Sequence, residues 1–380
     1  MRPLHICFIC NEYPPAPHGG IGTFTQTLAR ALVQRGHRVT VFGMHSDRPA
    51  GTESDGGVEV VRISRRGLPL LRFALNRRKF AEAYRRVHAA HPIDIVEGAE
   101  IDVWLLSRSL PGVKVLRMHG GPTFFATGIR IQVLKEGWGL RAVQHLCAVS
   151  HCVADGTRRM LKLGNRPIEV IPNPINTEVF APVTGDVAEE DGLILFAGTI
   201  TERKGIRQLI QAMPRIVAEA PQAHLEVYGG EAIDPPPSEP MTPRLIQMMP
   251  AEVAAHVEWK GRVERTVLPR AIRRASICVY PSHIEAMPIA WLEGLAAGKA
   301  VVASQTGPGP EIIDDGITGL LCNPHDPDSI ASAILRLLKD PDLRRRLGAA
   351  ARQTAMERYS LEKIVDRNLE YYAKITQLGS

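Results

Sequence analysis

Short, unbroken runs of apolar residues alternate with helical stretches along most of this chain, and that alternation limits its fold more than any other feature. Strands covered on both faces read as continuous Val, Ile and Leu runs, whereas strands with one wet face alternate apolar and polar residues. The pattern therefore predicts an α/β protein whose parallel sheets carry helices on both faces. The runs that we interpret as strands lie at 4–10, 37–43, 58–63, 93–98, 113–119, 144–150, 168–173, 193–198, 224–230, 277–282 and 300–304.

The alternation pauses once, in the Pro-, Gly- and acid-rich segment 173–192, and then restarts. Because 380 residues exceed what one hydrophobic core usually serves, we expect two domains. We interpret 1–180 and 181–360 as two Rossmann-like, doubly wound domains, and 361–380 as a C-terminal helix that packs on the first. Ligands of such sheets bind beyond the carboxyl ends of the strands, so the loops there are where chemistry is expected.

A second Pro-rich segment, 231–250, contains six prolines. Long connections of this kind are either surface insertions or lids over a binding site. We favour the insertion.

The first residues of the chain bear on whether the protein is secreted. The run MRPLHICFICNEYPP holds only a short apolar stretch, which fits a first strand better than a secretory signal. Cys7 and Cys10 fall inside that strand, and no second cysteine pair follows at metal-ligand spacing, so we interpret both as core residues. No stretch approaches the roughly 20 apolar residues that cross a bilayer. We expect reduced thiols and a cytoplasmic protein.

The net charge of +6 is unevenly distributed. Residues 1–180 carry 24 Lys and Arg against 14 Asp and Glu, a balance of +10, whereas the rest carries 22 against 26. The excess is densest between Arg62 and Arg86, where nine basic residues accompany one acid, Glu82. This stretch is either a solvated helix surface or a patch for an anionic membrane or a phosphorylated acceptor. We do not expect nucleic acid, since no nucleic-acid-binding motif accompanies the charge.

A glycine-rich loop, His18-Gly19-Gly20-Ile21-Gly22, separates the first strand from the first helix. Glycines let backbone N–H groups approach an anion, and the helix start adds positive dipole. The spacing is not that of dinucleotide-binding enzymes, and no acidic residue ends the second strand, which argues against NAD. A tight turn is the alternative interpretation.

Two further loops hold charged residues at strand ends. The loop that begins at Thr199 brings Arg203 and Lys204 to the start of a helix, where the helix dipole disfavours cations but phosphates would attract them. Later, Glu285 precedes a helix expected to start at Pro288, and Glu293 lies about one and a half turns inside that helix. Two carboxylates so placed suit different hydroxyls of one extended ligand. The alternative interpretations are a solvated helix start for Arg203 and Lys204, and an acid at a helix start plus a surface Glu for Glu285 and Glu293.

His119 ends a strand beside two glycines, so we expect it to face the cleft predicted between the two domains. A hydrogen-bonded structural histidine is the alternative. Asp314 and Asp315 fall in an apparent turn before Gly316, and we assign no metal site. We find no Ser-His-Asp order either.

These motifs together resemble the retaining glycosyltransferases of family 4, which have the GT-B architecture of two Rossmann-like domains facing a cleft. The resemblance covers nearly the whole chain. It is most specific in HIEAMPIAWLEGLAAGKAVVASQTGPGPEIIDDGITGLL, which matches the family's Glu-x7-Glu donor signature. The weaker matches lie at 19–43, 170–180 and 196–206.

The resemblance implies a role for each candidate residue. Arg203 and Lys204 would neutralise the donor's pyrophosphate, Glu285 would contact the donor sugar, and Glu293 would hold the ribose. The family often has Arg where this chain has Thr199, and Arg203 would then replace that charge. The remaining implied donor contacts are His119 from the N-terminal domain, the cleft-lining Gly19 and Gly20, and the backbone around Ala286, Met287, Pro288 and Ile289.

The implied activity is transfer of a sugar from a UDP- or GDP-linked donor to an acceptor hydroxyl, with retention and without metal or cofactor. The basic stretch favours a lipid-linked, polysaccharide or glycoconjugate precursor as acceptor and a peripheral position on the membrane. A soluble natural-product acceptor is the alternative. A nucleotide-sugar epimerase of the same architecture and a non-catalytic nucleotide-sugar-binding protein are competing functions.

Overall fold

The computed structural model describes residues 2–16, 18–46, 49–65, 72–121, 124–125, 130–182, 187–231 and 240–377. The chain divides into two compact units. Unit 1 comprises Met1–Pro174 together with Leu361–Ser380, and unit 2 comprises Ile175–Ser360. The division therefore falls six residues before the expected position at 180.

Unit 1 is built on an eight-stranded sheet with the order β3-β4-β2-β1-β5-β6-β7-β8. Every neighbouring pair is parallel except β3 and β4. The strands are β1 (His5–Ile9), β2 (Arg38–His45), β3 (Gly51–Asp55), β4 (Val58–Ser64), β5 (Ile95–Ala99), β6 (Val113–Met118), β7 (His145–Ala148) and β8 (Ile168–Val170). The helices are α1 (Gly20–Gln34), α2 (Arg72–Ala90), η1 (Val103–Leu105), α3 (Arg130–Ala142), α4 (His151–Met160) and α13 (Leu361–Gln377).

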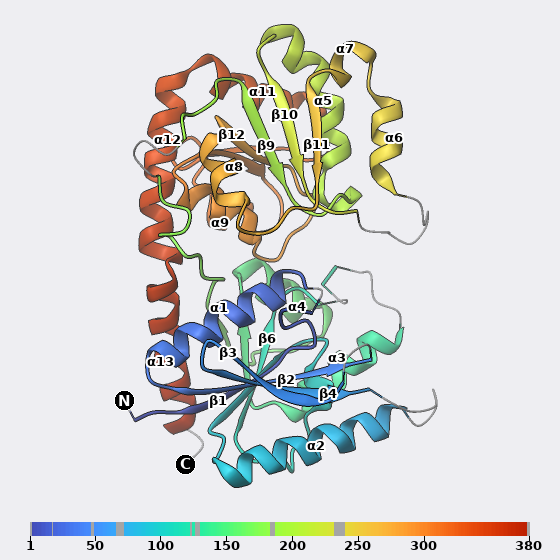
Figure 1. The fold of residues 1–380 in the computed structure, drawn as a ribbon, viewed down its shortest axis with the longest axis vertical. Helices are drawn as coiled ribbons and strands as arrows, with labels where there is room; N and C mark the ends of the chain where they lie inside the picture. The colour runs from blue at the N-terminus through green and yellow to red at the C-terminus, as the bar shows by residue number, and fades with distance from the viewer. Residues whose placement is uncertain are drawn as a thin grey trace. The chain divides into compact units, whose positions relative to one another are not determined.

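The C-terminal helix α13 belongs to unit 1, where it lies beside α1 (Figure 1). Its buried residues include Ile364 and Ile375, which join the core formed by β1, β2 and α1. A buried ion pair reinforces this packing: Arg117 on β6 contacts Glu97 on β5 at 2.6 Å, and Tyr372 of α13 donates a hydrogen bond to Glu97 at 2.9 Å. The end of the chain is thus part of the first hydrophobic core.

Unit 2 has a six-stranded, all-parallel sheet with the order β11-β10-β9-β12-β13-β14. The strands are β9 (Leu193–Ala197), β10 (His224–Tyr228), β11 (Val257–Gly261), β12 (Ile277–Tyr280), β13 (Ala300–Ser304) and β14 (Leu320–Cys322). The helices are η2 (Glu202–Lys204), α5 (Ile206–Glu219), α6 (Met241–Met248), α7 (Ala251–Ala254), α8 (Leu268–Arg274), α9 (Ile289–Ala296), α10 (Gly309–Ile312), α11 (Pro327–Lys339), α12 (Pro341–Thr354) and the π-helix η3 (Ala355–Tyr359). These sheets confirm the predicted α/β class.

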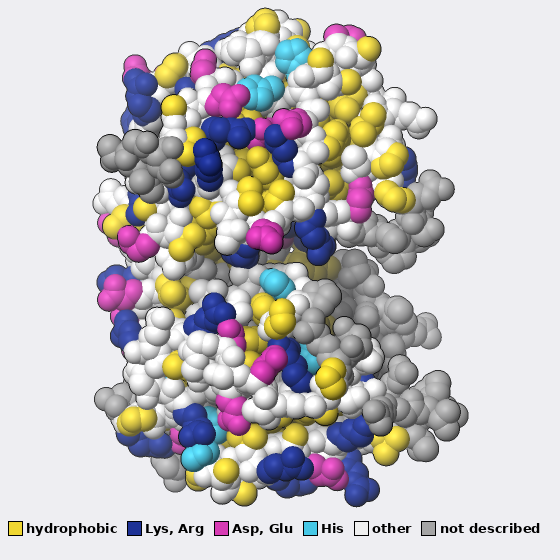
Figure 2. All heavy atoms as spheres, in the orientation of Figure 1, with side chains coloured by type: hydrophobic (Ala, Val, Ile, Leu, Met, Phe, Trp, Pro, Cys, Tyr) yellow, Lys and Arg dark blue, Asp and Glu magenta, His cyan; other side chains and the backbone are white. Residues whose placement is uncertain are grey.

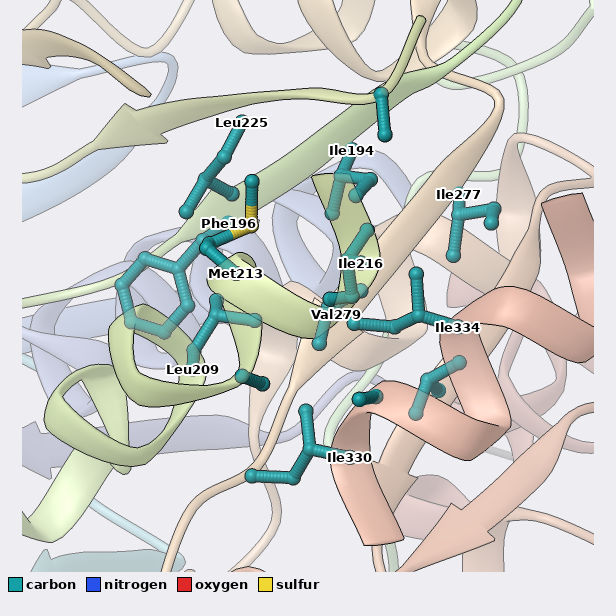
Figure 3. Packing of buried hydrophobic residues seen from close by; sticks show 14 of the residues in the cluster. Ile194, Phe196, Leu209, Met213, Ile216, Leu225, Ile277, Val279, Ile330 and Ile334 are labelled. Carbon is teal, nitrogen blue, oxygen red and sulfur yellow. The ribbon is translucent and has the colours of Figure 1, made fainter. Parts of the chain in front are cut away.

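The core of unit 2 lies between the sheet and the helices α5 and α11 (Figure 3). Ile194 and Phe196 of β9 meet Leu209 of α5, and Ile330 of α11 packs on the same cluster. The sequence predicted a continuous apolar strand at 193–198, and every residue of β9 is buried. Because the strands of this sheet are all parallel, their carboxyl ends lie at one edge.

Three short strands were not predicted, namely β3, β11 and β14. β3 has the polar sequence GTESD, lies at the sheet edge and pairs antiparallel with β4. Gly56 and Gly57 connect the two strands and both have positive φ, which is the conformation of a two-residue hairpin turn. The Asp-Gly-Gly sequence carried that signal.

The Pro-rich segment 231–250 falls partly outside the described residues, which resume at 240. Its second half forms α6, so it is not wholly irregular. Within the described part of the chain, no helix combines the length and apolarity needed to cross a membrane.

Candidate functional site

The loops after β9 and β12 lie against each other at the carboxyl edge of unit 2. His283 donates its backbone N–H to the carbonyl of Arg203 at 2.8 Å. A Cβ on Gly205 would come within 1.8 Å of the carbonyl oxygen of Pro281, and Gly205 has a φ of +69°. Only glycine permits this approach and this conformation. The close approach brings the basic pair of one loop to the acid of the other.

Glu285 is the centre of this arrangement. Its carboxylate contacts Lys204 Nζ at 2.5 Å and Arg203 Nη1 at 3.3 Å. Glu285 is buried, whereas Arg203 and Lys204 stay partly exposed. Burial alone raises the pKa of Glu285, but the charges of Lys204 and Arg203 outweigh it and bring the pKa below its ordinary value. The site therefore holds an ionised carboxylate beside two cations.

Helix α9 positions the second carboxylate. The sequence predicted that Pro288 occupies the first position of this helix. In the structure Pro288 is the N-cap residue, and Ile289 is the first helical residue. Glu293 lies inside α9 and is 3% exposed. Burial raises its pKa, and the charge of Arg265, whose Nη2 lies 2.6 Å from Oε1, opposes that effect.

The backbone that joins the two carboxylates runs through Ala286 and Met287, which are both buried. Thr199 is exposed and directly follows Gly198, whose backbone N–H donates a hydrogen bond to the carbonyl of Tyr228 at 2.8 Å. The structure thus places Thr199 at the start of the loop that carries Arg203 and Lys204.

Two residues of this edge were missed by sequence reasoning. A Cβ on Gly307 would lie 3.4 Å from the backbone N and O of Glu285, so the loop after β13 borders the site. Arg265 follows β11, a half-polar edge strand that the search for apolar runs did not detect. The Gly-Pro-Gly-Pro sequence that begins at Gly307 is a turn signal for the loop after β13, but no spacing rule pointed to Arg265.

His119 lies in unit 1, just past the end of β6. Its backbone N–H donates to Glu100 Oε2 at 3.0 Å, and its ring meets the ring of Phe24 edge-on at 4.7 Å. Although part of the residue stays accessible to solvent, burial of the ring and the nearby Arg117 charge lower the pKa of His119 to about 3. The imidazole is therefore neutral at physiological pH.

Glu100 supports His119 from a buried position. Burial raises the pKa of Glu100 to about 7, although hydrogen bonds from backbone N–H groups, including that of His119, act in the opposite direction. Sequence reasoning did not single out this residue.

Gly19 and Gly20 lie at the start of α1 and are exposed. The carboxylate of Glu12 already accepts a hydrogen bond from the backbone N–H of Gly22 at 2.6 Å. The start of α1 thus faces an acidic side chain of its own unit, and an incoming anion would meet that charge. Nothing within 4 Å would touch a Cβ on Gly20, so the space beside it is open.

The basic stretch from Arg62 to Arg86 is not a uniform surface. Arg62 is 6% exposed, pairs with Glu53 at 2.6 Å and donates to the backbone carbonyl of Pro14 at 2.8 Å. It is therefore a structural residue that holds the loop after β1. Residues 66–71 and the side chain of Arg72 lie outside the described residues. Over α2, Lys and Arg side chains gather with an acidic one among them (Figure 2).

The structure brings together Arg203, Lys204, Glu285 and Glu293, with Arg265 added, at the edge of unit 2. His119, Gly19 and Gly20 lie in unit 1. Among the described residues, no group of three or more His, Cys, Asp or Glu side chains is arranged to hold a metal ion.

Two family models match the chain. "Glycosyltransferase Family 4" matches residues 18–179, and "Glycosyl transferases group 1" matches residues 183–354. Together they span both units, and the second contains all the residues gathered at the edge of unit 2.

Curated relatives match over nearly their whole length. Alpha-maltose-1-phosphate synthase of Mycolicibacterium smegmatis is 28% identical over 98% of this chain and 100% of its own. The phosphatidyl-myo-inositol mannosyltransferase of the same organism is 27% identical over 99% of this chain and 95% of its own. Among solved structures, Anabaena HepE in complex with UDP-glucose covers 98% of this chain and 100% of its own, with 16% identity and a TM-score of 0.77. That likeness concerns the fold.

Proposed function

Because this chain belongs to glycosyltransferase family 4 and has the GT-B fold, we propose that it transfers a sugar from a nucleoside diphosphate sugar to an acceptor hydroxyl, with retention at the anomeric carbon. The observation that carries the proposal is the Glu285 carboxylate held between Lys204 and Arg203 at the carboxyl edge of the unit 2 sheet. Ligands of such sheets bind at that edge.

The cations supply the electrostatic part of the reaction. When the bond between the anomeric carbon and the phosphate oxygen breaks, negative charge develops on the departing diphosphate. The side chains of Lys204 and Arg203 are 19% and 37% exposed, so both remain accessible to a bound diphosphate. Preorganised charge of this kind is commonly the largest catalytic contribution.

The carboxylates and the backbone between them position the donor. Glu285 accepts hydrogen bonds from sugar hydroxyls, and Glu293 accepts them from the ribose. The backbone of Ala286, Met287, Pro288 and Ile289 leads into the start of α9, where free N–H groups and the helix dipole favour phosphate. In this proposal the neutral imidazole of His119 also contacts the donor sugar, and Gly19 and Gly20 leave room for substrate.

Retention needs no nucleophile from the protein in this scheme. The acceptor oxygen forms its bond to the anomeric carbon on the face that the diphosphate leaves, and the leaving phosphate oxygen takes the acceptor's proton. The protein's part is to hold two substrates in register and to stabilise leaving-group charge. NMR analysis of the product's anomeric configuration tests this, and an inverted linkage would rule it out.

The proposed acceptor carries negative charge and is lipid-linked. The support is the excess of exposed basic residues on α2, together with a relative named for mannosyl transfer to phosphatidyl-myo-inositol. The other relative is named for maltose 1-phosphate synthesis, which favours a soluble acceptor as the second candidate. Co-sedimentation with anionic vesicles at low salt separates them, because only a membrane-proximal enzyme should pellet with the vesicles.

The first experiment is a thermal-shift screen against UDP, GDP, ADP and their sugar conjugates, with EDTA present because the proposal requires no metal. A nucleotide that binds only the folded protein stabilises it by about 2.7 kcal/mol at a hundredfold excess over its Kd. A clear shift with one nucleotide supports the proposal and identifies the donor base. No shift with any of them contradicts the proposal. Isomerisation of the donor without acceptor would favour an epimerase, and binding without transfer to any acceptor would favour a non-catalytic protein.

A further inference from the structure

Arg265 is the cation that faces the second carboxylate of the site. It lies in the loop between β11 and α8, and its Nη2 is 2.6 Å from Glu293 Oε1. The Arg265 side chain is 47% exposed, whereas that of Glu293 is 4% exposed. The pair therefore joins a solvent-facing guanidinium to a nearly enclosed carboxylate.

The surroundings of Glu293 make this contact important. Burial raises the pKa of Glu293, and Arg265 is the charge that opposes the rise. The other titratable groups near it are Cys278 and Tyr280 of β12, whose burial raises their own pKa values and keeps them neutral. From α12, Arg352 donates to the carbonyl of Ala296 at the far end of α9.

The contact also leaves part of the carboxylate for a ligand. Within the described residues, the Glu293 carboxylate accepts one hydrogen bond, which Arg265 donates to Oε1. Oε2 keeps its acceptor capacity, and an ionised carboxylate has about four lone-pair sites in all. Oε2 can therefore accept hydrogen bonds from two neighbouring hydroxyls of a bound molecule.

Each of the two carboxylates of the site contacts a cation from a loop that follows a strand. Glu285 is held by cations from the loop after β9, and Glu293 is held by a cation from the loop after β11. Both pairs lie at the same edge of the sheet, because β9 and β11 are both neighbours of β10 in a parallel arrangement.

We propose that Arg265 is a positioning residue of the donor site, which keeps Glu293 ionised and oriented so that Oε2 accepts the ribose hydroxyls of the donor nucleotide. Arg265 thereby sets the preference for ribonucleotides over 2′-deoxynucleotides. This inference rests on the proposed function, in which Glu293 holds the ribose. A site built to hydrogen-bond a hydroxyl discriminates strongly against the analogue that lacks it.

The test is calorimetric titration of the full chain with UDP, 2′-deoxy-UDP, GDP and 2′-deoxy-GDP, at several pH values between 6 and 8.5. The variants are Arg265→Ala and Arg265→Lys. Arg270→Ala is the matched control, since Arg270 is an exposed arginine on the adjacent α8. Thermal melting without nucleotide checks that each variant is folded.

We expect Arg265→Ala to bind the ribonucleotide about tenfold more weakly at pH 6, because charge-assisted hydrogen bonds are roughly twice as strong as neutral ones. The loss should shrink as the pH rises and Glu293 ionises without help. Discrimination against the 2′-deoxynucleotide should fall at low pH, Arg265→Lys should restore much of it, and Arg270→Ala should behave as wild type.

Two results would overturn the inference while leaving the proposed function intact. One is unchanged affinity and discrimination in Arg265→Ala. The other is a loss that is equal for both sugars and independent of pH, which would mean that Arg265 contacts another part of the nucleotide. If the wild-type chain binds none of the four nucleotides, the proposed function fails and this inference with it.

Discussion

At the scale of single residues, the site depends on two buried carboxylates, Glu285 and Glu293, that each face a cation. An ionised carboxylate removed from water needs a cation or several hydrogen bonds. Glu285 has Lys204 and Arg203, and Glu293 has Arg265. The cations of the two carboxylates come from two different loops, the one after β9 and the one after β11, so these ion pairs form only in the folded protein.

Glu285→Gln tests the role of the first carboxylate. The amide keeps the shape but loses the charge, so nucleotide should still bind while transfer falls by about 10² or more. Steady-state rates and calorimetric nucleotide binding measure the two effects separately. Glu202→Gln is the control, since Glu202 lies in the same loop and pairs with Arg207. Normal turnover of Glu285→Gln would show that Glu285 does not act on the donor sugar.

Glu100→Gln tests a buried carboxyl through the pH dependence of stability. The pKa of Glu100 is about 7 in the folded protein, against an ordinary value of 4.5. The folded state thus holds the proton more tightly, so its stabilising contribution is complete below about pH 4.5 and disappears as the pH rises through 7. Between pH 5 and pH 8, wild type should lose up to about 3 kcal/mol of unfolding free energy relative to Glu100→Gln.

Urea denaturation at both pH values measures that difference. Glu362→Gln, at an exposed position on α13, is the control and should show little relative change. Equal pH dependence of wild type and Glu100→Gln would mean that Glu100 titrates normally and is not enclosed as the structure indicates.

At the scale of elements, the close approach of the loops after β9 and β12 assembles the site. Gly205 ends η2 and precedes α5, and its contact with Pro281 sets the distance between the two loops. The sequence predicted β9, β12 and the following helices, because continuous apolar runs and helical periodicity are local signals. It did not predict β11, which is half polar, nor the contact between loops, which depends on how the strands are ordered in the sheet.

Gly205→Ala should disrupt this contact. Gly205 and Gly261 both have positive φ, +69° and +66°, but a Cβ would meet the backbone of Pro281 at the first and nothing within 4 Å at the second. A left-handed conformation costs a residue other than glycine roughly 1–2 kcal/mol. Gly261→Ala should therefore lose about that much stability, and Gly205→Ala at least twice as much together with nucleotide affinity. Urea denaturation and thermal shift measure both, and equal losses would contradict the close approach.

At the scale of the whole molecule, the chain leaves unit 1 at Pro174 and returns to it at Leu361. The returning helix α13 contributes apolar residues to the first core, and Asn368 and Tyr372 add hydrogen bonds to the buried Arg117–Glu97 pair. A buried ion pair that loses its supporting partners becomes costly.

A chain that ends at Ser360 should therefore have an unstable unit 1 and a folded unit 2, whose core contains no residue of α13. Limited proteolysis with mass spectrometry measures this, and cleavage should concentrate within residues 1–174. Tyr372→Phe in the full chain removes one hydrogen bond and should cost only about 1 kcal/mol. Equal protection of both units in the truncated chain would show that α13 is dispensable for the first core.

The sequence by itself determined the α/β class, the strands that are apolar throughout and the motifs that carry the family resemblance. These features are set by residues close together in the chain, so periodicity and turn chemistry reveal them. The tertiary structure alone decided which cation holds which carboxylate: Arg265 meets Glu293, and Lys204 meets Glu285. It also buried Arg62, which the charge pattern grouped with surface residues, against Glu53 and the loop after β1. Such pairings depend on strand order and loop approach across long sequence separations, and no local pattern encodes them.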